Sequence, residues 1–222
     1  MADRSSPQIG VFGVGSREKF DAIIYKGLFM PGLDHFSFIA PFYDRVFGSS
    51  DHSKLFELLA LPDGGKLLDA GGGTGRVSRH LCAKAGLVVI ADEAPGMLEQ
   101  ANSRECLVTS LAQSEALPFE DDCFDGIIMV DALHHVSHQQ KSLAEMVRVL
   151  KPGGRLVVEE PDIAHFGVKL IAIAEKLLFM RSHFLSPDQI QAALPKQISS
   201  RIVVEGPSAW VVVEKKILIK LT

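Results

Sequence analysis

The sequence is poor in the residues that a disulfide scaffold or a zinc site requires. Its 222 residues include only three cysteines, Cys82, Cys106 and Cys123, an odd number without paired spacing. This usage predicts separate buried thiols in a reducing compartment rather than a disulfide framework or a zinc site. We therefore expect a cytoplasmic chain without a bound metal.

Long apolar runs and a strong excess of either charge are also missing. No run of about 18 uncharged apolar residues occurs, so no transmembrane helix is expected, and the polar start MADRSSPQ lacks the apolar core of a signal peptide. The net charge is −4, and no basic cluster is interleaved with aromatic residues. These absences argue against stable membrane insertion and against a nucleic-acid partner.

What the chain does contain is enough apolar sequence for the core of one domain, since 47% of its residues are hydrophobic. Eight of the thirteen phenylalanines and both tyrosines lie in residues 11–56. Prolines and glycines break this segment into short pieces, which predicts a lid of short helices over residues 1–56, ahead of a domain over 57–222. Alternatively, the aromatic residues only pack against the edge of a sheet.

A glycine-rich turn follows the first predicted strand, residues 66–70. It contains Asp69, Gly71, Gly73 and Gly75. Glycine lets the backbone adopt positive φ and lets a ligand approach closely, and the start of a following helix, predicted over 76–85, presents free N–H groups. The turn is therefore a candidate ligand loop, although an ordinary βα turn has the same composition.

The turn differs from the dinucleotide fingerprint G-x-G-x-x-G in two ways. Its third glycine comes one residue earlier, and an acid precedes its first glycine. Asp69 adds negative charge, which suits a ligand with positive charge better than a pyrophosphate. S-adenosylmethionine (SAM) carries a sulfonium and an ammonium group. The stretch D-A-G-G-G-T-G, residues 69–75, resembles motif I of the class I SAM-dependent methyltransferases.

A second acid, Asp92, ends the apolar run 87–91 and lies 17 residues after Gly75. In a right-handed βαβ unit, this strand end lies beside the glycine loop. A carboxylate there can accept hydrogen bonds from both ribose hydroxyls, although an acid at a strand end can also serve as a helix cap. The sequence thus makes Asp92 a cofactor-binding candidate.

Two further stretches resemble methyltransferase motifs. Residues 93–98 are similar to D-x-S-P-x-M-L, which implies cofactor-binding positions at Glu93 and Met97, the latter against the adenine. Residues 112–119 resemble G-D-A-E-x-L-P-F, which implies that Gln113 accepts from the adenine amino group and that the backbone N–H of Ser114 donates to the ring. Gln113 replaces an acid, but its oxygen still accepts.

The resemblance narrows to one branch of the family. Ala40-Pro41-Phe42-Tyr43-Asp44 is similar to the A-P-x-Y-D element of type 11 methyltransferases, the UbiE-like enzymes of menaquinone and ubiquinone biosynthesis. This implies that Tyr43 lies near the cofactor, although a structural tyrosine fits the residues equally well.

The order of the remaining elements completes the expected fold. A strand over 124–131, a helix over 137–150, the turn K-P-G-G and a strand over 155–160 are typical of class I methyltransferases. The resemblance implies an α/β, Rossmann-like fold with a seven-stranded, mostly parallel sheet, helices on both faces and a C-terminal antiparallel hairpin. That hairpin is predicted over 201–205 and 209–215, after a substrate-side insertion at 162–197.

The candidate catalytic residue is His134, in the segment Asp131-Ala132-Leu133-His134-His135 after the fourth strand. Ligands of α/β proteins bind at the carboxyl ends of the strands, and an unperturbed histidine titrates at about pH 6.5, which suits a general base. His134 could instead pack or orient the substrate. Asp131, at the same edge, is a further cofactor-binding candidate.

These motifs imply methyl transfer from SAM, with S-adenosylhomocysteine as the product. The aromatic segment and the apolar stretch 167–185 favour a small, neutral, apolar or lipid-like acceptor, methylated by in-line displacement. The same segments could instead simply cover the sheet, and N- or O-methylation of another small molecule is the main competing reaction. The alternative is a SAM- or adenosine-binding protein without transferase activity, which Gln113 and Ala94 favour weakly. The sequence leaves the oligomeric state open.

Overall fold

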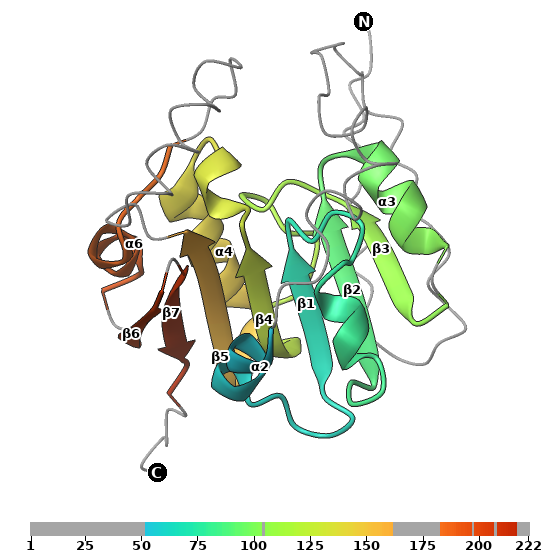
Figure 1. The fold of residues 1–222 in the computed structure, drawn as a ribbon, viewed down its shortest axis with the longest axis horizontal. Helices are drawn as coiled ribbons and strands as arrows, with labels where there is room; N and C mark the ends of the chain where they lie inside the picture. Colours follow the sequence, from blue (N-terminus) through green and yellow to red (C-terminus); the bar gives the residue numbers. More distant parts are fainter. Residues whose placement is uncertain (1–51, 104, 162–182, 197, 207, 217–222) are drawn as a thin grey trace, which may run out of the picture.

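A seven-stranded sheet forms the centre of the computed structural model, which describes residues 52–103, 105–161, 183–196, 198–206 and 208–216. The strand order is β3-β2-β1-β4-β5-β7-β6 (Figure 1). The strands are β1 (Lys66–Ala70), β2 (Leu87–Asp92), β3 (Leu107–Leu111), β4 (Phe124–Val130), β5 (Leu150–Pro161), β6 (Ser199–Glu205) and β7 (Ser208–Glu214). Strands β1 to β5 pair in parallel and β7 is antiparallel to both neighbours, so the predicted fold class is confirmed.

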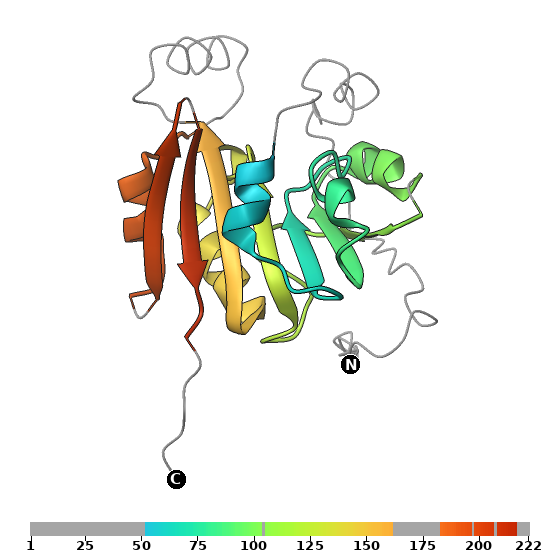
Figure 2. The same cartoon turned by 60° about the horizontal axis from the view of Figure 1, so that its bottom comes forward.

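Successive side chains along each strand point to opposite faces of the sheet, so the core has two layers. Side chains on one face, such as Leu68 and Ile127, pack with α4 (Gln139–Val149) and α6 (Pro187–Ala193). Those on the other face, such as Leu67 and Ile128, pack with α2 (Ser53–Leu59) and α3 (Pro95–Asn102). Figures 1 and 2 show α2 on the side of the sheet opposite α4. A parallel sheet covered on both faces explains why its strands are continuous apolar runs.

The helix predicted over residues 76–85 is wrong in type and length. The structure has a 3₁₀ turn, η2 (Ser78–Leu81), flanked by further turns. Several hydrogen bonds there reach back three residues, as from the amide of Cys82 to the carbonyl of Arg79 (3.3 Å). Val77 and Leu81 are nevertheless buried, as predicted. Apolar spacing indicates which side chains face the sheet, and it does not choose between two helix types that share this spacing over one turn.

The fifth strand also differs from its prediction, because it begins at Leu150 instead of at 155. Leu150 pairs with Phe124, and the next pair joins Gly126 to Arg155. The four residues of K-P-G-G therefore form an irregular, bulged start of β5 rather than a separate turn.

The prediction of three separate thiols is wrong as well. Cys82, after η2, and Cys106, before β3, form a disulfide whose Cα atoms lie 5.9 Å apart, whereas Cys123 is free. The fold brings together two segments 24 residues apart in sequence, a pairing that spacing alone does not reveal. Cysteine usage therefore no longer argues for a reducing compartment.

Several predictions concern residues outside the described ranges. They include almost all of the lid over 1–56, most of the insertion at 162–197, and Tyr43. Among the helices that the structure describes, none has the length and apolar character needed to cross a bilayer.

The disulfide predicts a thiol count. Protein purified without reductant and then denatured should show one reactive thiol per chain with a thiol reagent, and three after reduction. Cys82→Ser should lower the free energy of unfolding by about 3 kcal/mol, because the bridge closes a loop of moderate length. Three reactive thiols without reduction would contradict the pairing; Cys123→Ser, which leaves the bridge intact, is the control.

Candidate active site

The glycine loop joins β1 to η2 at the carboxyl edge of the sheet, where the arrowheads of β1, β2, β4 and β5 point in Figure 1. Gly71 and Gly73 adopt φ of 69° and 54°, values that favour glycine. A Cβ on Gly71 would lie 2.8 Å from the Cβ of Ala132, so the loop presses against the segment after β4. A Cβ on Gly73 would have Met97 Sδ, at 3.9 Å, as its nearest neighbour, which leaves the backbone open to a ligand on that side.

Asp92 is fixed at the end of β2 by two backbone donors. The amide of Gly73 donates to Oδ2 (2.9 Å) and the amide of Ala94 to Oδ1 (2.8 Å). Each carboxylate oxygen can accept more than one hydrogen bond. The predicted ribose acceptor therefore lies beside the glycine loop with its orientation set by the loop itself.

Asp69 lies beneath the loop rather than in the open. Its exposed fraction is 2%, and a Cβ on Gly72 would lie 2.5 Å from its carboxyl carbon. Its Oδ2 has no hydrogen-bond partner among the described residues. Burial raises the pKa of Asp69 to about 7, and the charge of Asp92 acts in the same direction. A buried carboxylate below a glycine cradle fits a cationic cofactor.

Arg76 is a further buried residue at this edge that is not among the candidates predicted from the sequence. It is 8% exposed, and its guanidinium lies 3.3 Å from His52 Nε2 and 3.8 Å from Asp131 Oδ2. Asp131 itself has φ of 51°, an uncommon value for a residue with a side chain. The arginine thus joins the glycine loop to the end of β4, and its position directly after the last glycine was the available signal.

His134 lies in the 3₁₀ turn η3 (Leu133–His135) and forms a buried pair with Glu160 of β5. The distance from His134 Nδ1 to Glu160 Oε2 is 2.5 Å. Glu160 Oε1 accepts from the amides of Ala132 (3.1 Å) and Leu133 (2.7 Å). The sequence predicts that His134 lies at this edge, but it does not predict the partner Glu160, which it marks only as a charged residue at the end of an apolar strand.

Two rings flank this histidine. Phe184 stacks on His134 at 4.3 Å between ring centroids with 12° between planes, and the His135 ring lies at 4.0 Å. Burial lowers the pKa of His135 to about 3, so this ring stays neutral in the ordinary pH range. Two rings, one of them apolar, therefore contact His134.

The segment predicted to bind the adenine, residues 112–119 (the adenine segment), follows β3. The amide of Ala112 donates to the carbonyl of Asp92 (3.0 Å), so the segment begins beside the ribose candidate. Gln113 and Glu93 are exposed, Ser114 is half-buried, and Met97 is buried. No hydrogen bond or ion pair of the described residues joins the Gln113 side chain to the other candidates, so its contact with the adenine stays a prediction.

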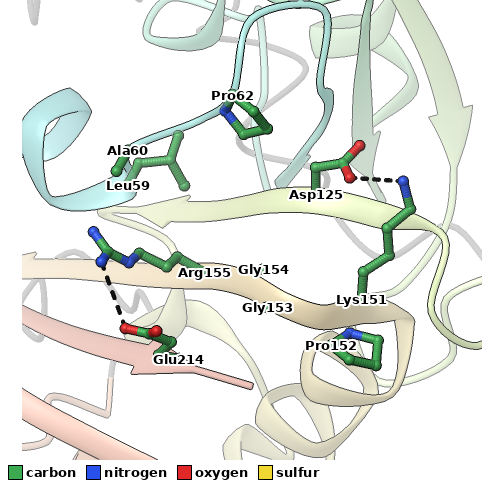
Figure 3. Close-up of a pocket in the computed structure, with 10 residues that line it drawn as sticks. All are labelled: Leu59, Ala60, Pro62, Asp125, Lys151, Pro152, Gly153, Gly154, Arg155 and Glu214. Carbon is green, nitrogen blue, oxygen red and sulfur yellow. Dashed lines mark hydrogen bonds and ion pairs between the residues drawn. The ribbon is translucent and has the colours of Figure 1, made fainter. Parts of the chain in front are cut away.

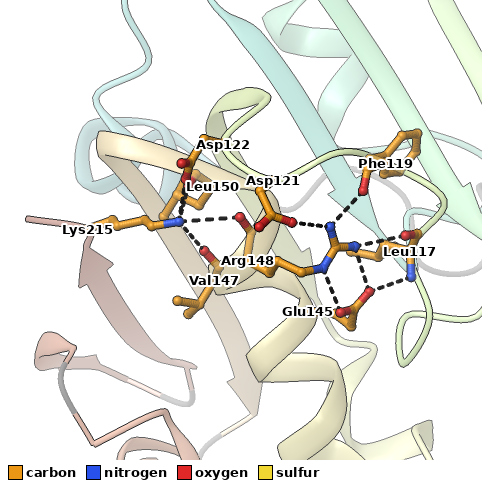
Figure 4. Close-up of polar contacts among 9 residues, drawn as sticks. All are labelled: Leu117, Phe119, Asp121, Asp122, Glu145, Val147, Arg148, Leu150 and Lys215. Carbon is orange, nitrogen blue, oxygen red and sulfur yellow. Dashed lines mark hydrogen bonds and ion pairs between the residues drawn. The ribbon is translucent and has the colours of Figure 1, made fainter. Parts of the chain in front are cut away.

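Arg148 holds the end of this segment against α4 (Figure 4). Its guanidinium donates to the carbonyls of Leu117 (3.0 Å) and Phe119 (2.8 Å) and pairs with Glu145 and Asp121 (both 2.8 Å). These contacts join residues 117–121 to α4. Residues 120–122 are exposed, but Asp121 pairs with Arg148 and Asp122 with Lys215 (2.6 Å).

A cavity of about 300 Å³ lies at the opposite, amino edge of the strands. Asp125 pairs with Lys151 (2.7 Å) and Arg155 with Glu214 (3.5 Å) along its wall (Figure 3). Its charged side chains are satisfied by one another. The residues that can do chemistry gather instead at the carboxyl edge, as expected for a parallel α/β sheet.

The sheet order, the glycine loop and the acid at the end of β2 define the class I SAM-dependent methyltransferase fold. Residues 68–158 match the type 11 family model, described as "Methyltransferase domain". This part of the chain is therefore a methyltransferase domain, and the resemblance to UbiE-like class I enzymes is confirmed. Family and fold imply SAM as the cofactor.

Known proteins similar to this chain agree with that assignment. The ubiquinone/menaquinone biosynthesis C-methyltransferase UbiE of Pseudomonas fluorescens (strain Pf0-1) is 39% identical over 114 residues, 47% of this chain and 44% of the relative. A demethylmenaquinone methyltransferase of Clavibacter sepedonicus is 41% identical over 101 residues, 44% of this chain and 41% of the relative. The matched part thus spans less than half of either relative.

A solved structure matches over a greater length. The crystal structure of a SAM-dependent methyltransferase from Thermotoga maritima ("possible histamine N-methyltransferase") has a TM-score of 0.66 and 25% identity. The match covers 82% of this chain and 98% of that chain. The likeness therefore extends well beyond residues 68–158.

The raised pKa of Asp69 predicts a pH dependence of stability. A carboxyl group whose pKa is higher in the folded state stabilises that state at pH values below its ordinary pKa of 3.8. This contribution is lost as the pH rises to the folded-state pKa of about 7. Between pH 5 and 8, wild type should lose about 2–3 kcal/mol of unfolding free energy relative to Asp69→Asn, at about 1.4 kcal/mol per unit. Urea unfolding measures the difference.

The control is Asp63→Asn, which changes an aspartate in an exposed turn. It should follow the wild-type pH dependence. Parallel stability curves for wild type and Asp69→Asn would show that the buried carboxyl does not titrate in this range.

Proposed function

We propose that the chain is a SAM-dependent methyltransferase that transfers the methyl group to a small, neutral, mostly apolar acceptor, with His134 as general base. The observation that carries the proposal is the approach of Gly71 to Ala132. It puts the glycine loop, the cofactor side, against the segment that bears the His134–Glu160 pair. A methyl donor and a proton acceptor would then meet at one edge of the sheet.

The residues around the loop would hold the cofactor. Asp92 would accept from the ribose hydroxyls, Met97 would pack on the adenine, and the amide of Ser114 would donate to the ring. Gly71, Gly73 and Gly75 would let the backbone approach, and Glu93, Gln113, Asp131 and Tyr43 remain candidates for contacts. The cofactor supplies an electrophilic methyl group on a positively charged sulfur, to which the ionised form of the buried Asp69 carboxyl is complementary.

The chain's own contribution to the reaction is alignment, exclusion of water and removal of a proton. In-line displacement requires that the nucleophile, the methyl carbon and the sulfur lie in a straight line. When His134 Nε2 takes the proton of an acceptor hydroxyl, the oxygen, or a carbon that this oxygen activates, becomes nucleophilic. The His134 side chain is 5% exposed, so the transfer would occur away from bulk water.

The surroundings of His134 support an apolar acceptor. Phe184 stacks on its ring, and the two nearby carboxylates are engaged, Glu160 by three donors and Asp131 by Arg76. A flat neutral molecule would gain about 25 cal/mol per Å² of apolar surface removed from water. Quinols fit this description: one curated relative is named for ubiquinone/menaquinone biosynthesis and another is named as a demethylmenaquinone methyltransferase. A lid over 1–56, a substrate-side insertion at 162–197 and a cytoplasmic location belong to the same proposal.

Loss of the Asp92 carboxylate should weaken cofactor binding. Asp92→Ala is expected to reduce the binding free energy of SAM and of S-adenosylhomocysteine by about 1–3 kcal/mol, as for a charged hydrogen bond. Asp92→Asn, which keeps one acceptor oxygen, should lose less. Calorimetry measures both, with circular dichroism to verify folding; unchanged affinity in a folded Asp92→Ala protein would remove the assignment.

Loss of the base should slow turnover and spare cofactor binding. With a demethylated quinol as acceptor and radiolabelled SAM, His134→Ala should lower kcat by roughly 10²-fold or more. His138→Ala, which changes an exposed histidine at the start of α4, is the matched control and should keep wild-type turnover. Full turnover by His134→Ala would mean that alignment alone carries the reaction.

The same assay separates the alternative function. A SAM- or adenosine-binding protein without transferase activity would bind the cofactor with the Asp92 dependence given above. It would transfer no label to quinols, other phenols or small amines. That outcome would overturn the proposed enzyme and leave the cofactor site intact.

A further inference from the structure

We propose that Glu160 is a positioning residue that selects the tautomer of His134, keeping the proton on Nδ1 and the lone pair on Nε2. The inference deepens the proposed function, on which its catalytic meaning rests. Its structural content, the tautomer, can be tested without any acceptor.

The donors around Glu160 assign its role. The amides of Ala132 and Leu133 can only donate, and both point at Oε1. A carboxylate can only accept. The partner at Oε2, His134 Nδ1, must therefore carry a proton, so that in the neutral ring the lone pair lies on Nε2.

The ring has little freedom to leave this orientation. Both side chains of the pair are buried, at 5% and 6% exposed, and Phe184 and His135 lie against the imidazole. A flip of the ring would turn Nδ1 away from the carboxylate and leave a buried charge without one of its donors, which is unfavourable. Packing and hydrogen bonding thus select the same arrangement.

The turn that carries His134 is also held from the opposite side. Gln139 Nε2, in the first turn of α4, donates to the carbonyls of Leu133 (2.9 Å) and His183 (2.7 Å). The amide of His183 donates to the carbonyl of His134 (2.7 Å). Strand β5 therefore fixes the imidazole, while α4 and the segment at 183 fix its backbone.

This arrangement has a consequence for catalysis. A base that already has its proton on Nδ1 needs no rearrangement before Nε2 accepts another, and the carboxylate stabilises the imidazolium that results. With Nε2 protonated instead, the ring would present a donor where the reaction needs an acceptor. The expected effect of losing Glu160 is therefore on kcat and not on the affinity for SAM.

Nitrogen-15 NMR of histidine-labelled protein tests the tautomer directly. The chain has eight histidines, and the signal lost in His134→Ala identifies the residue. In wild type at pH 8, His134 should show a protonated Nδ1 and an unprotonated Nε2. In Glu160→Gln it should shift toward the Nε2-protonated form, which predominates in free histidine. Glu159→Gln, which alters the neighbouring carboxylate of β5, should leave the His134 signal unchanged.

Turnover supplies the second readout. Glu160→Gln should lower kcat by roughly 10²-fold, with SAM affinity within about twofold of wild type. An Nε2-protonated His134 in wild type would overturn the inference even if Glu160→Gln failed to fold. So would an unchanged tautomer in the folded variant. Absence of methyl transfer by wild type, with the tautomer as predicted, would instead overturn the proposed function.

Discussion

The close approach of Gly71 to Ala132 is the contact on which the rest of the site depends. Because Gly71 has positive φ and no side chain, the turn after β1 packs directly against the turn after β4. That contact sets the glycine loop beside the segment of His134. An alanine at position 71 would meet both a strained backbone and a clash at 2.8 Å. In the proposed function, this single glycine would couple the cofactor half of the site to the acceptor half.

Charge is the second constraint at this edge, because five carboxylates converge on it. Backbone amides donate hydrogen bonds to the carboxylates of Asp92 and Glu160, and Arg76 lies beside Asp131. Burial raises the pKa values of Asp69 and Glu159 to about 7, so both are only partly ionised near neutral pH. The site thus carries enough negative charge to favour a cationic cofactor, while the charges nearest the proposed acceptor are already engaged.

The fold was predictable because local signals agree with one another. Continuous apolar runs define strands buried on both faces, and glycine spacing marks the loop. The disulfide and the partner of His134 were not predictable, because Cys82 and Cys106, and His134 and Glu160, meet only through strand order. The type of helix after the loop was missed since apolar spacing over one turn fits both α and 3₁₀ geometry. Asp92 and His134 could be assigned to one edge of the sheet from the sequence because the carboxyl ends of parallel strands share that edge.

The central claim is that the reacting methyl group faces His134, and a crystal structure with bound S-adenosylhomocysteine tests it most directly. The account predicts ribose hydroxyls on Asp92, the amino-acid portion along the glycine loop, and the sulfur oriented toward Nε2 of His134 with space for a small flat molecule between them. A sulfur directed away from η3, or a ligand seated at the amino edge of the sheet, would contradict it.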